Sequence, residues 1–162
     1  MQILAATGHR PNKLGGYSES AQSKLKHIAK TYLMMQPEIL KQGITVISGM
    51  ALGWDTAWAL AALELDIPVI AAIPFVGQER LWPRESQLLF HEIRKKAVEV
   101  VIVSDGGYAV EKMQIRNEWM VDHCTTLVAL WDGSRGGTYN CIQYARKFKR
   151  PIVNLWEHYD SI

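Results

Sequence analysis

Short apolar runs rich in β-branched residues recur along the chain, and nearly every one is followed by a cluster of Gly, polar or charged residues. Runs of this kind predict buried strands. The predicted strands span residues 2–6, 44–47, 69–73, 99–103, 126–131 and 152–155. Apolar residues at helical spacing between these runs predict helices. The predicted helices span residues 18–35, 54–65, 84–98, 108–124 and 139–148, and Ser18 is the expected N-cap of the first.

Strands that alternate with helices predict a doubly wound, Rossmann-like α/β fold with a mainly parallel sheet and helices on both faces. The length of 162 residues is that of one domain, which we expect to span residues 1–162. Ligands of such sheets bind outside the carboxyl ends of the strands. The polar clusters that follow the first five strands are therefore expected to converge on one crevice.

The loop after the second predicted strand has the features of a phosphate site. Ser48, Gly49 and Gly53 precede a predicted helix, whose free N–H groups and dipole would attract an anion. Asp55 would accept a hydrogen bond from a ribose hydroxyl or complement the helix dipole. A Gly-containing turn before a helix is also ordinary structure, so both interpretations stay open.

The amino-acid sequence of this loop is more informative than the spacing of its glycines. Residues 48–55 read Ser-Gly-Met-Ala-Leu-Gly-Trp-Asp, which resembles the SGxAxGxD motif of the Smf/DprA proteins and of the wider SLOG superfamily of Rossmann-like domains. Residues 7–11, Thr-Gly-His-Arg-Pro, and the segment Ile73-Pro74-Phe75 with Gln78 and Trp82 look like the YpsA branch of that superfamily. The resemblance covers essentially the whole chain. It implies a site for a nucleotide or nucleotide derivative and an assembly of two or more subunits.

A second resemblance bears on catalysis. LOG-type phosphoribohydrolases of the same superfamily use an Arg in an MHxRKxxM helix and a Glu in PGGxGTxxE. Arg116 matches that arginine and Gly137-Thr138 match the loop, but Cys141 stands where the catalytic Glu would be. The missing carboxylate argues against hydrolysis by the LOG mechanism. Other carboxylates near strand ends are Asp132, which is placed best, and Asp55, Asp105 and Glu118; each could instead cap a helix or face solvent.

Several side chains allow two interpretations. Arg116 and Arg135 are candidate phosphate partners, and His9 and Arg10 either reach the same ligand or form a loop salt bridge. Cys141 is expected to be a buried, inert thiol. Trp54 and Trp58 either pack on the sheet or form a subunit contact. The basic runs 94–96 and 146–150 lie near predicted helix ends, and we interpret them as solvated ends.

Composition limits the class of protein. Eighteen Lys and Arg against sixteen Asp and Glu give a formal charge of +2, which makes nucleic acid a poor candidate partner and gives no reason to expect a membrane surface. Two cysteines cannot form a multi-disulfide framework, and no N-terminal stretch reads as a signal peptide or membrane span. We expect a reduced, cytoplasmic protein. No HExxH or CxxC spacing is present, so neither a metal site nor a resident cofactor is expected.

The leading hypothesis is a protein that senses or sequesters a nucleotide-like ligand such as ADP-ribose or NAD. The alternatives are an N-glycosidic hydrolase of nucleoside monophosphates or NAD, with Arg116 and Asp132 as tentative catalytic residues, and a DprA-like protein that binds single-stranded DNA. The expected ligand-binding residues are Thr7, Gly8, His9, Arg10, Ser48, Gly49, Gly53, Asp55, Pro74, Phe75, Trp82, Arg116, Arg135, Gly136, Gly137 and Thr138.

Overall fold

A computed structural model of the chain describes residues 1–162 and contains six parallel strands. The strands are β1 (Gln2–Gly8), β2 (Ile44–Ser48), β3 (Val69–Ile73), β4 (Glu99–Ile102), β5 (Thr126–Leu130) and β6 (Ile152–Asn154). The α-helices are α1 (Glu19–Met34), α2 (Trp54–Glu64), α3 (Arg84–Lys96), α4 (Val110–His123), α5 (Gly137–Lys147) and α6 (Trp156–Asp160). The predicted Rossmann-like fold is confirmed.

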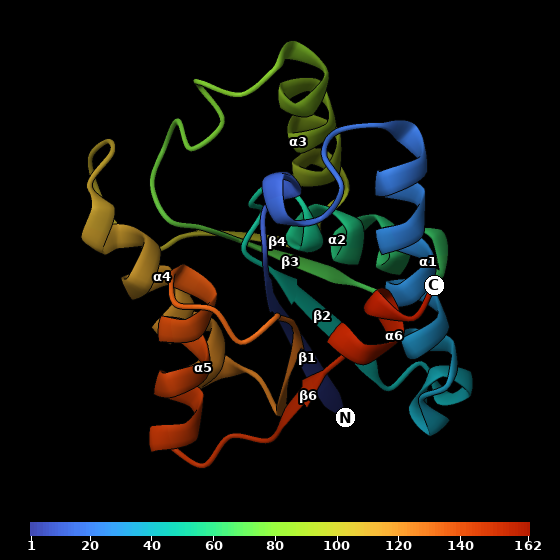
Figure 1. Ribbon diagram of the computed structural model, residues 1–162. Helices are drawn as coiled ribbons and strands as arrows, with labels where there is room; N and C mark the ends of the chain where they lie inside the picture. Colours follow the sequence, from blue (N-terminus) through green and yellow to red (C-terminus); the bar gives the residue numbers. More distant parts are fainter.

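The strand order across the sheet is β4-β3-β2-β1-β5-β6. The chain builds outward from β1 to β4, returns through α4 and places β5 on the other side of β1 (Figure 1). The order of the strands therefore reverses between β1 and β5, and such a switch point is where open α/β sheets bind ligands. Leu4 pairs with Thr126 and Gly8 with Leu130, so the carboxyl ends of the two strands lie level.

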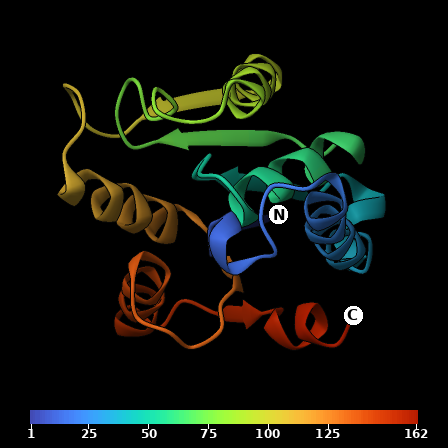
Figure 2. The same cartoon turned by 45° about the horizontal axis from the view of Figure 1, so that its top comes forward.

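Helices cover both faces of the sheet. Figure 2 shows α1 to α3 on one side and α4 and α5 on the other. The larger apolar cluster fills the side of α1 to α3, and a second cluster lies under α4 and α5. Two buried tryptophans hold α2 against the sheet: the indole N–H of Trp54 donates to the Val128 carbonyl and that of Trp58 to the Leu4 carbonyl, each at 3.3 Å.

These contacts decide between the two interpretations of Trp54 and Trp58. Both side chains have no exposed surface, so they pack on the sheet and do not form a subunit contact. Burial of a Trp requires a partner for its N–H, and the strand carbonyls supply it.

The element boundaries differ from the prediction at the ends. Ser18 is the N-cap of α1, as predicted, because its Oγ accepts a hydrogen bond from the Ala21 amide at 3.1 Å. The predicted helix from residue 108 starts only at Val110, because the backbone of Ala109 is extended (φ −155°, ψ 138°). Helix α6 was not predicted.

Candidate functional site

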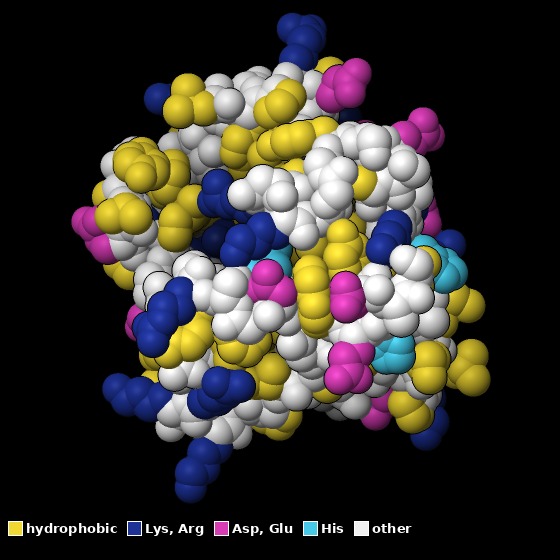
Figure 3. All heavy atoms as spheres, viewed as in Figure 1, with side chains coloured by type: hydrophobic (Ala, Val, Ile, Leu, Met, Phe, Trp, Pro, Cys, Tyr) yellow, Lys and Arg dark blue, Asp and Glu magenta, His cyan; other side chains and the backbone are white.

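A cavity of about 300 Å³ opens at the switch point between β1 and β5. Loops after β1, β2 and β5 line it together with the inner face of α4. The space-filling view shows a hollow on this face, with Lys and Arg side chains around and inside it (Figure 3). Ten of the predicted binding residues line this cavity: Thr7, Gly8, His9, Arg10, Asp55, Arg116, Arg135, Gly136, Gly137 and Thr138.

The walls and the rim of the cavity differ in exposure. The walls carry buried polar side chains: Thr7, Asp55 and Arg116 are each 5% exposed, and Asn117 is 7% exposed. The rim carries exposed groups, including Arg10, Lys13, Arg135 and the two glycines that open α5. A ligand can therefore enter from the rim while one end of it meets buried polar groups.

The N-terminus of α5 faces this cavity without a cap. Gly136 is the N-cap residue and has no side chain, and the first turn contains no acidic residue. The amides of Gly137, Thr138 and Tyr139 donate no hydrogen bond within the protein, whereas the Asn140 amide bonds to the Gly136 carbonyl at 3.0 Å. A Cβ on Gly136 or Gly137 would meet nothing within 4 Å, so the space in front of these amides is open. Free helix amides of this kind attract anions.

Arg116 presents the second set of donors. Its Nε donates to Asn117 Oδ1 at 3.0 Å, and its Nη1 donates to the carbonyl of Gly49. The second terminal nitrogen of the guanidinium, Nη2, makes no hydrogen bond within the protein. A guanidinium held rigidly on one edge and free on the other can bind a phosphate oxygen.

The glycine at the end of β2 makes room for this arginine. A Cβ built on Gly49 would lie 2.7 Å from Arg116 Nη1 and 2.8 Å from Asp55 Oδ2. Only a residue without a side chain fits between the two charged groups. Gly49 thus serves the site indirectly, by letting Arg116 approach the backbone, and the prediction that its own amide holds phosphate is not supported.

The first amide of α2 is occupied within the protein, and the partners of Ser48 and Gly53 correct their predicted role. The Trp54 amide donates to the His9 carbonyl at 3.2 Å. A Cβ on Gly53 would lie 2.5 Å from that same carbonyl oxygen, so Gly53 is needed for the close approach of the β1 loop. Ser48 Oγ donates to the Asp55 carbonyl at 2.8 Å and accepts from the Met50 amide at 3.1 Å. These groups stabilise the loop, and neither Ser48 nor Gly53 lines the switch-point cavity.

Asp55 is the one buried carboxylate of the cavity. Burial raises its pKa to about 6, although Arg116, the Ala51 amide and Arg10 all favour the charged form. Oδ2 accepts from the Ala51 amide at 3.4 Å. A carboxyl group with this pKa gains and loses a proton close to neutral pH.

Asp132 is held in a network that joins the β1 and β5 loops. Its Oδ1 lies 2.8 Å from His9 Nε2, and it accepts from the Ser134 amide at 2.9 Å and the Ser134 hydroxyl at 2.5 Å. Lys13 donates to the same hydroxyl at 2.6 Å. The bonds from Ser134 and His9 hold the pKa of Asp132 well below its usual range. The tentative role of Asp132 as an acid-base group is therefore not supported, and His9 is a loop partner.

Cys141 occupies the position of the LOG glutamate and is fully buried. Burial raises the pKa of its thiol to about 12. A neutral thiol cannot replace a carboxylate in glycosidic chemistry. The interpretation of Cys141 as a buried thiol is in keeping with this environment.

Six predicted ligand residues lie outside the cavity lining: Ser48, Gly49 and Gly53, described above, and Pro74, Phe75 and Trp82. Pro74 and Phe75 are buried beyond β3. The Phe75 ring packs edge-on against the Tyr108 ring, with 5.7 Å between the ring centroids. The Trp82 ring packs edge-on against the ring of Phe90 on α3, with 5.5 Å between the ring centroids. The loop after β3 reaches the back of the site through Gln78, whose Nε2 donates to the Gly49 carbonyl at 3.2 Å, but Pro74, Phe75 and Trp82 do not line the cavity.

The prediction also missed residues that line the cavity. They are Asn12, Lys13, Ala51, Met113, Asn117, Ser134 and Tyr139. Lys13 and Asn117 carried a signal, since each stands close in sequence to a predicted arginine, Arg10 or Arg116. The others are placed by the fold alone.

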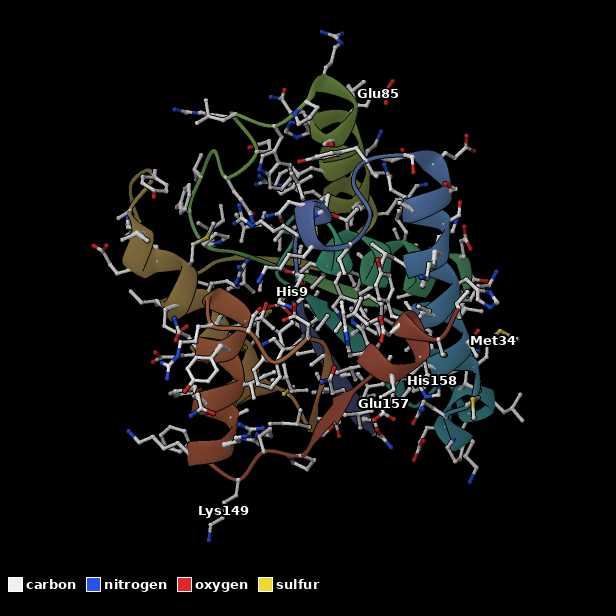
Figure 4. The ribbon with its side chains drawn as sticks, in the orientation of Figure 1. His9, Met34, Glu85, Lys149, Glu157 and His158 are labelled. Carbon is white, nitrogen blue, oxygen red and sulfur yellow. The ribbon has the colours of Figure 1, made fainter.

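A second cavity, of about 420 Å³, lies over α2 between α1 and α3. Its charged lining consists of Glu19, Lys26 and Glu85, and Lys26 is already paired with Glu64 at 2.6 Å. Glu85 lies at the start of α3, away from His9 and the switch point (Figure 4). Because its lining is acidic, this second cavity is a poor anion site. Gly53 is the one predicted ligand residue in its lining.

No group of three or more His, Cys, Asp or Glu side chains is arranged to hold a metal ion. None of the helices combines the length and apolar character needed to cross a membrane.

Comparisons with known proteins place the chain among relatives. It is 35% identical over 117 residues to an uncharacterised SPbeta prophage-derived protein, YoqJ, of Bacillus subtilis (strain 168), covering 62% of this chain and 68% of that protein. It is 23% identical over 167 residues to a UPF0398 protein of Bacillus cereus (strain AH820), covering 98% of this chain and 90% of the relative. These relatives are consistent with the YpsA-like branch of the SLOG superfamily.

Solved structures share the fold. DNA processing protein A of Streptococcus pneumoniae superposes with a TM-score of 0.67 at 20% identity, over 94% of this chain and 50% of that one. The protein of the same name from Helicobacter pylori, described for its single-stranded DNA binding mode, gives a TM-score of 0.67 at 17% identity, over 94% of this chain and 64% of that one. This chain therefore spans one half to two thirds of the length of these proteins.

The family model described as DNA recombination-mediator protein A matches residues 20–161. That match takes in β2 to β6 and every α-helix except the first residue of α1. It confirms the resemblance to the Smf/DprA proteins that the motif at residues 48–55 indicated. The chain belongs to the DNA recombination-mediator protein A family.

Proposed function

We propose that this protein binds a nucleotide or nucleotide derivative in the switch-point cavity, with a phosphate group against the N-terminus of α5. The observation that carries the proposal is the convergence of two sets of unpaired donors on one cavity. Gly137, Thr138 and Tyr139 line the cavity and have free amides, and Arg116, whose Nη2 has no partner in the protein, lines it too. Arg10, Lys13 and Arg135 add positive charge at the rim.

The volume of the cavity supports a ligand of modest size. About 300 Å³ is at the lower end of small-molecule sites, which fits a phosphate with its sugar and part of a base. With Cys141 buried and Asp132 engaged by Ser134 and His9, the role we favour is to sense or sequester the ligand.

Calorimetric titration with AMP, ADP-ribose, NAD and cyclic nucleotides tests this proposal. Adenosine is the matched control, because it lacks the phosphate that α5 and Arg116 would hold. We expect at least one phosphorylated compound to bind and adenosine to bind at least about tenfold more weakly. The proposal is contradicted if none of these compounds gives a heat of binding at high protein concentration.

A second candidate function is hydrolysis of an N-glycosidic bond, and Asp55 is the observation that favours it. A buried carboxyl group with a pKa of about 6 can act as a general acid or base near neutral pH. The test is incubation with AMP, cytidine monophosphate and NAD, read as released base by chromatography. Base release that is lost in Asp55→Asn supports this function. If the protein releases no more base than buffer alone, this function is excluded.

Nucleic acid has to be kept as a candidate partner. The formal charge of +2 is close to neutral, but the charged side chains are unevenly distributed. Four cations, Arg10, Lys13, Arg116 and Arg135, share one cavity with a single buried carboxylate. The Helicobacter relative is described as binding single-stranded DNA. Local charge governs such binding, so a near-neutral total does not exclude it.

A homo-oligomer also remains a proposal. Because Trp54 and Trp58 are buried within the subunit, any subunit contact would have to use another surface. Light scattering coupled to gel filtration gives the mass in solution directly. A reducing, cytoplasmic setting is likewise proposed, and both cysteines are free and buried.

A further inference from the structure

Strand β4 forms one margin of the sheet and has no neighbouring strand on its outer side. Figure 2 shows β4 at one margin of the sheet and β6 at the other. The Val103 amide donates to the Ile73 carbonyl of β3 at 2.8 Å, so the contact with β3 reaches residue 103. Successive backbone amides of a strand point to opposite sides. Because the Val103 amide points to β3, the amides of Val100 and Ile102 face the open margin.

The segment around β4 has the composition of a buried strand. Residues 98–103 read Val-Glu-Val-Val-Ile-Val, with five β-branched apolar residues and one charge. Nevertheless, Val98 is 67% exposed and Ile102 is 38% exposed. Val100 and Ile102 pair with β3 residues of the larger core cluster, so their side chains lie on the same face of the sheet as α3. The apolar surface therefore continues from the core to the open margin.

The margin at β6 is protected against pairing with another strand. Strand β6 has three residues, Pro151 precedes it, and α6 begins at Trp156 just after it. The Asn154 side chain bonds to the backbone of Trp131 at 2.9 and 3.1 Å. Short strands, prolines and covering elements are devices by which proteins block edge pairing, as are lysines. Residues 98–103 contain neither Pro nor Lys, so the β4 margin is free to accept a strand.

We propose that β4 pairs in antiparallel fashion with β4 of a second copy of this chain, so that the two six-stranded sheets join into one. The inference names a surface for the homo-oligomer proposed above and does not depend on the nucleotide site. A two-fold axis at Val100 places Val100 against its own copy and Val98 against the partner's Ile102. This register covers the exposed apolar side chains of each copy with those of the other.

Charges at the two ends of the strand select a second copy as the partner. The last turn of α3, which leads into β4, carries three cations at residues 94–96. Asp105, beyond the other end of the strand, is exposed. Antiparallel pairing brings the basic start of each strand to the acidic end of its partner. Glu99 lies opposite the partner's Val101 in this register, so the two glutamates do not face each other.

Pairing at β4 leaves the switch-point cavity open. Strands β3 and β2 lie between β4 and β1, and none of the residues that line the cavity belongs to the segment 98–103. Substitutions at this margin are therefore expected to change the assembly of the protein without changing its affinity for AMP.

The first test is the mass in solution, measured by light scattering coupled to gel filtration over a range of protein concentrations. We expect the unmodified chain to form a dimer. Ile102→Lys places a charge in the apolar contact and should raise the dissociation constant of the dimer at least about tenfold. The matched control is Met34→Lys, at a 58% exposed apolar residue of α1 (Figure 4), and it should leave the dimer unchanged. Circular dichroism should show both variants to be folded.

Cysteine cross-linking tests the register. In Val100→Cys the two new thiols face each other across a pair whose Cα atoms lie about 5.5 Å apart, within the range of a disulfide. Both native cysteines are buried, so oxidised glutathione should join the new thiols. In Ile102→Cys each thiol faces the partner's Val98, and we expect no cross-link, although residue 102 is more exposed than residue 100.

The opposite outcomes are equally specific. A chain that stays monomeric at every concentration overturns pairing with a second copy and leaves β4 to a strand of a different protein. A dimer that Ile102→Lys does not weaken overturns β4 as the contact. Cross-linking of Ile102→Cys but not of Val100→Cys overturns the register. A dimer that fails to bind AMP contradicts the proposed function and leaves this inference standing.

Discussion

The carbonyl of Gly49 accepts a hydrogen bond from Nη1 of Arg116, and this contact joins the end of β2 to α4 at the wall of the cavity. It fixes one edge of the guanidinium and leaves Nη2 without a partner in the protein. The contact depends on the missing side chain of Gly49, since a Cβ there would lie 2.7 Å from Nη1.

Gly49→Ala is therefore expected to displace Arg116. We predict a loss of about 1–3 kcal/mol in the free energy of unfolding from the steric conflict, and a drop of about tenfold or more in affinity for AMP. Urea denaturation and calorimetry measure the two effects. Gly107→Ala is the matched control, because a Cβ at Gly107 meets nothing within 4 Å. An unchanged affinity in Gly49→Ala contradicts this account of Arg116.

Arg116→Lys keeps the charge but removes the planar fork. A single ammonium cannot reach the Gly49 carbonyl, Asn117 and a ligand together, so we expect about tenfold weaker binding of AMP. Arg135→Lys, at the exposed rim, should change the affinity less than about threefold because exposed charges are screened by solvent. Equal effects of the two substitutions would mean that the buried guanidinium has no special part in binding.

Asp55 should make anion binding dependent on pH. As the pH falls through about 6, the pKa of Asp55, the carboxylate gains a proton and the cavity loses a buried negative charge. Sulfate keeps its charge over this range, and we expect its affinity to rise about three- to tenfold between pH 7.5 and 5. In Asp55→Asn the affinity should already be high at pH 7.5 and change little with pH. The same pH slope in both proteins would show that another group titrates.

Asp132 should stabilise the fold at neutral pH without acting on a ligand. In Asp132→Ala, Ser134 and His9 lose their acceptor, and we expect about 1–2 kcal/mol less free energy of unfolding at pH 7. Because folding lowers the pKa of Asp132, its contribution is present above pH ~4 and is lost as the pH falls below that value. Urea denaturation at pH 7 and pH 2.5 measures the change. Asp122→Ala, which removes an exposed acceptor of Tyr144, is the control and should show no such trend.

The sequence predicted the strands and the closeness of their polar ends because these features are local. Strand β3 spans residues 69–73 as predicted, between Pro68 and Pro74, which limit it on both sides. The roles within the site were less predictable because they depend on distant partners. Asp132 is bound by His9, 123 positions away, and the amide of Trp54 is occupied by the carbonyl of His9. Spacing alone cannot show which amides at a Gly-containing helix start already have a partner. The starts of α2 and α5 therefore looked equivalent in the sequence, although the first amide of α2 is bonded to His9 and the first three amides of α5 are free.

The measurement that tests the central claim most directly is an NMR titration of ¹⁵N-labelled protein with AMP, followed at individual backbone amides. The account predicts that the amide signals of Gly137, Thr138 and Tyr139 shift most, because these donors are free and face the cavity. The Trp54 amide, which is bonded to His9, should shift little. Shifts centred on α2, or no shift at α5 while AMP binds, would contradict the claim.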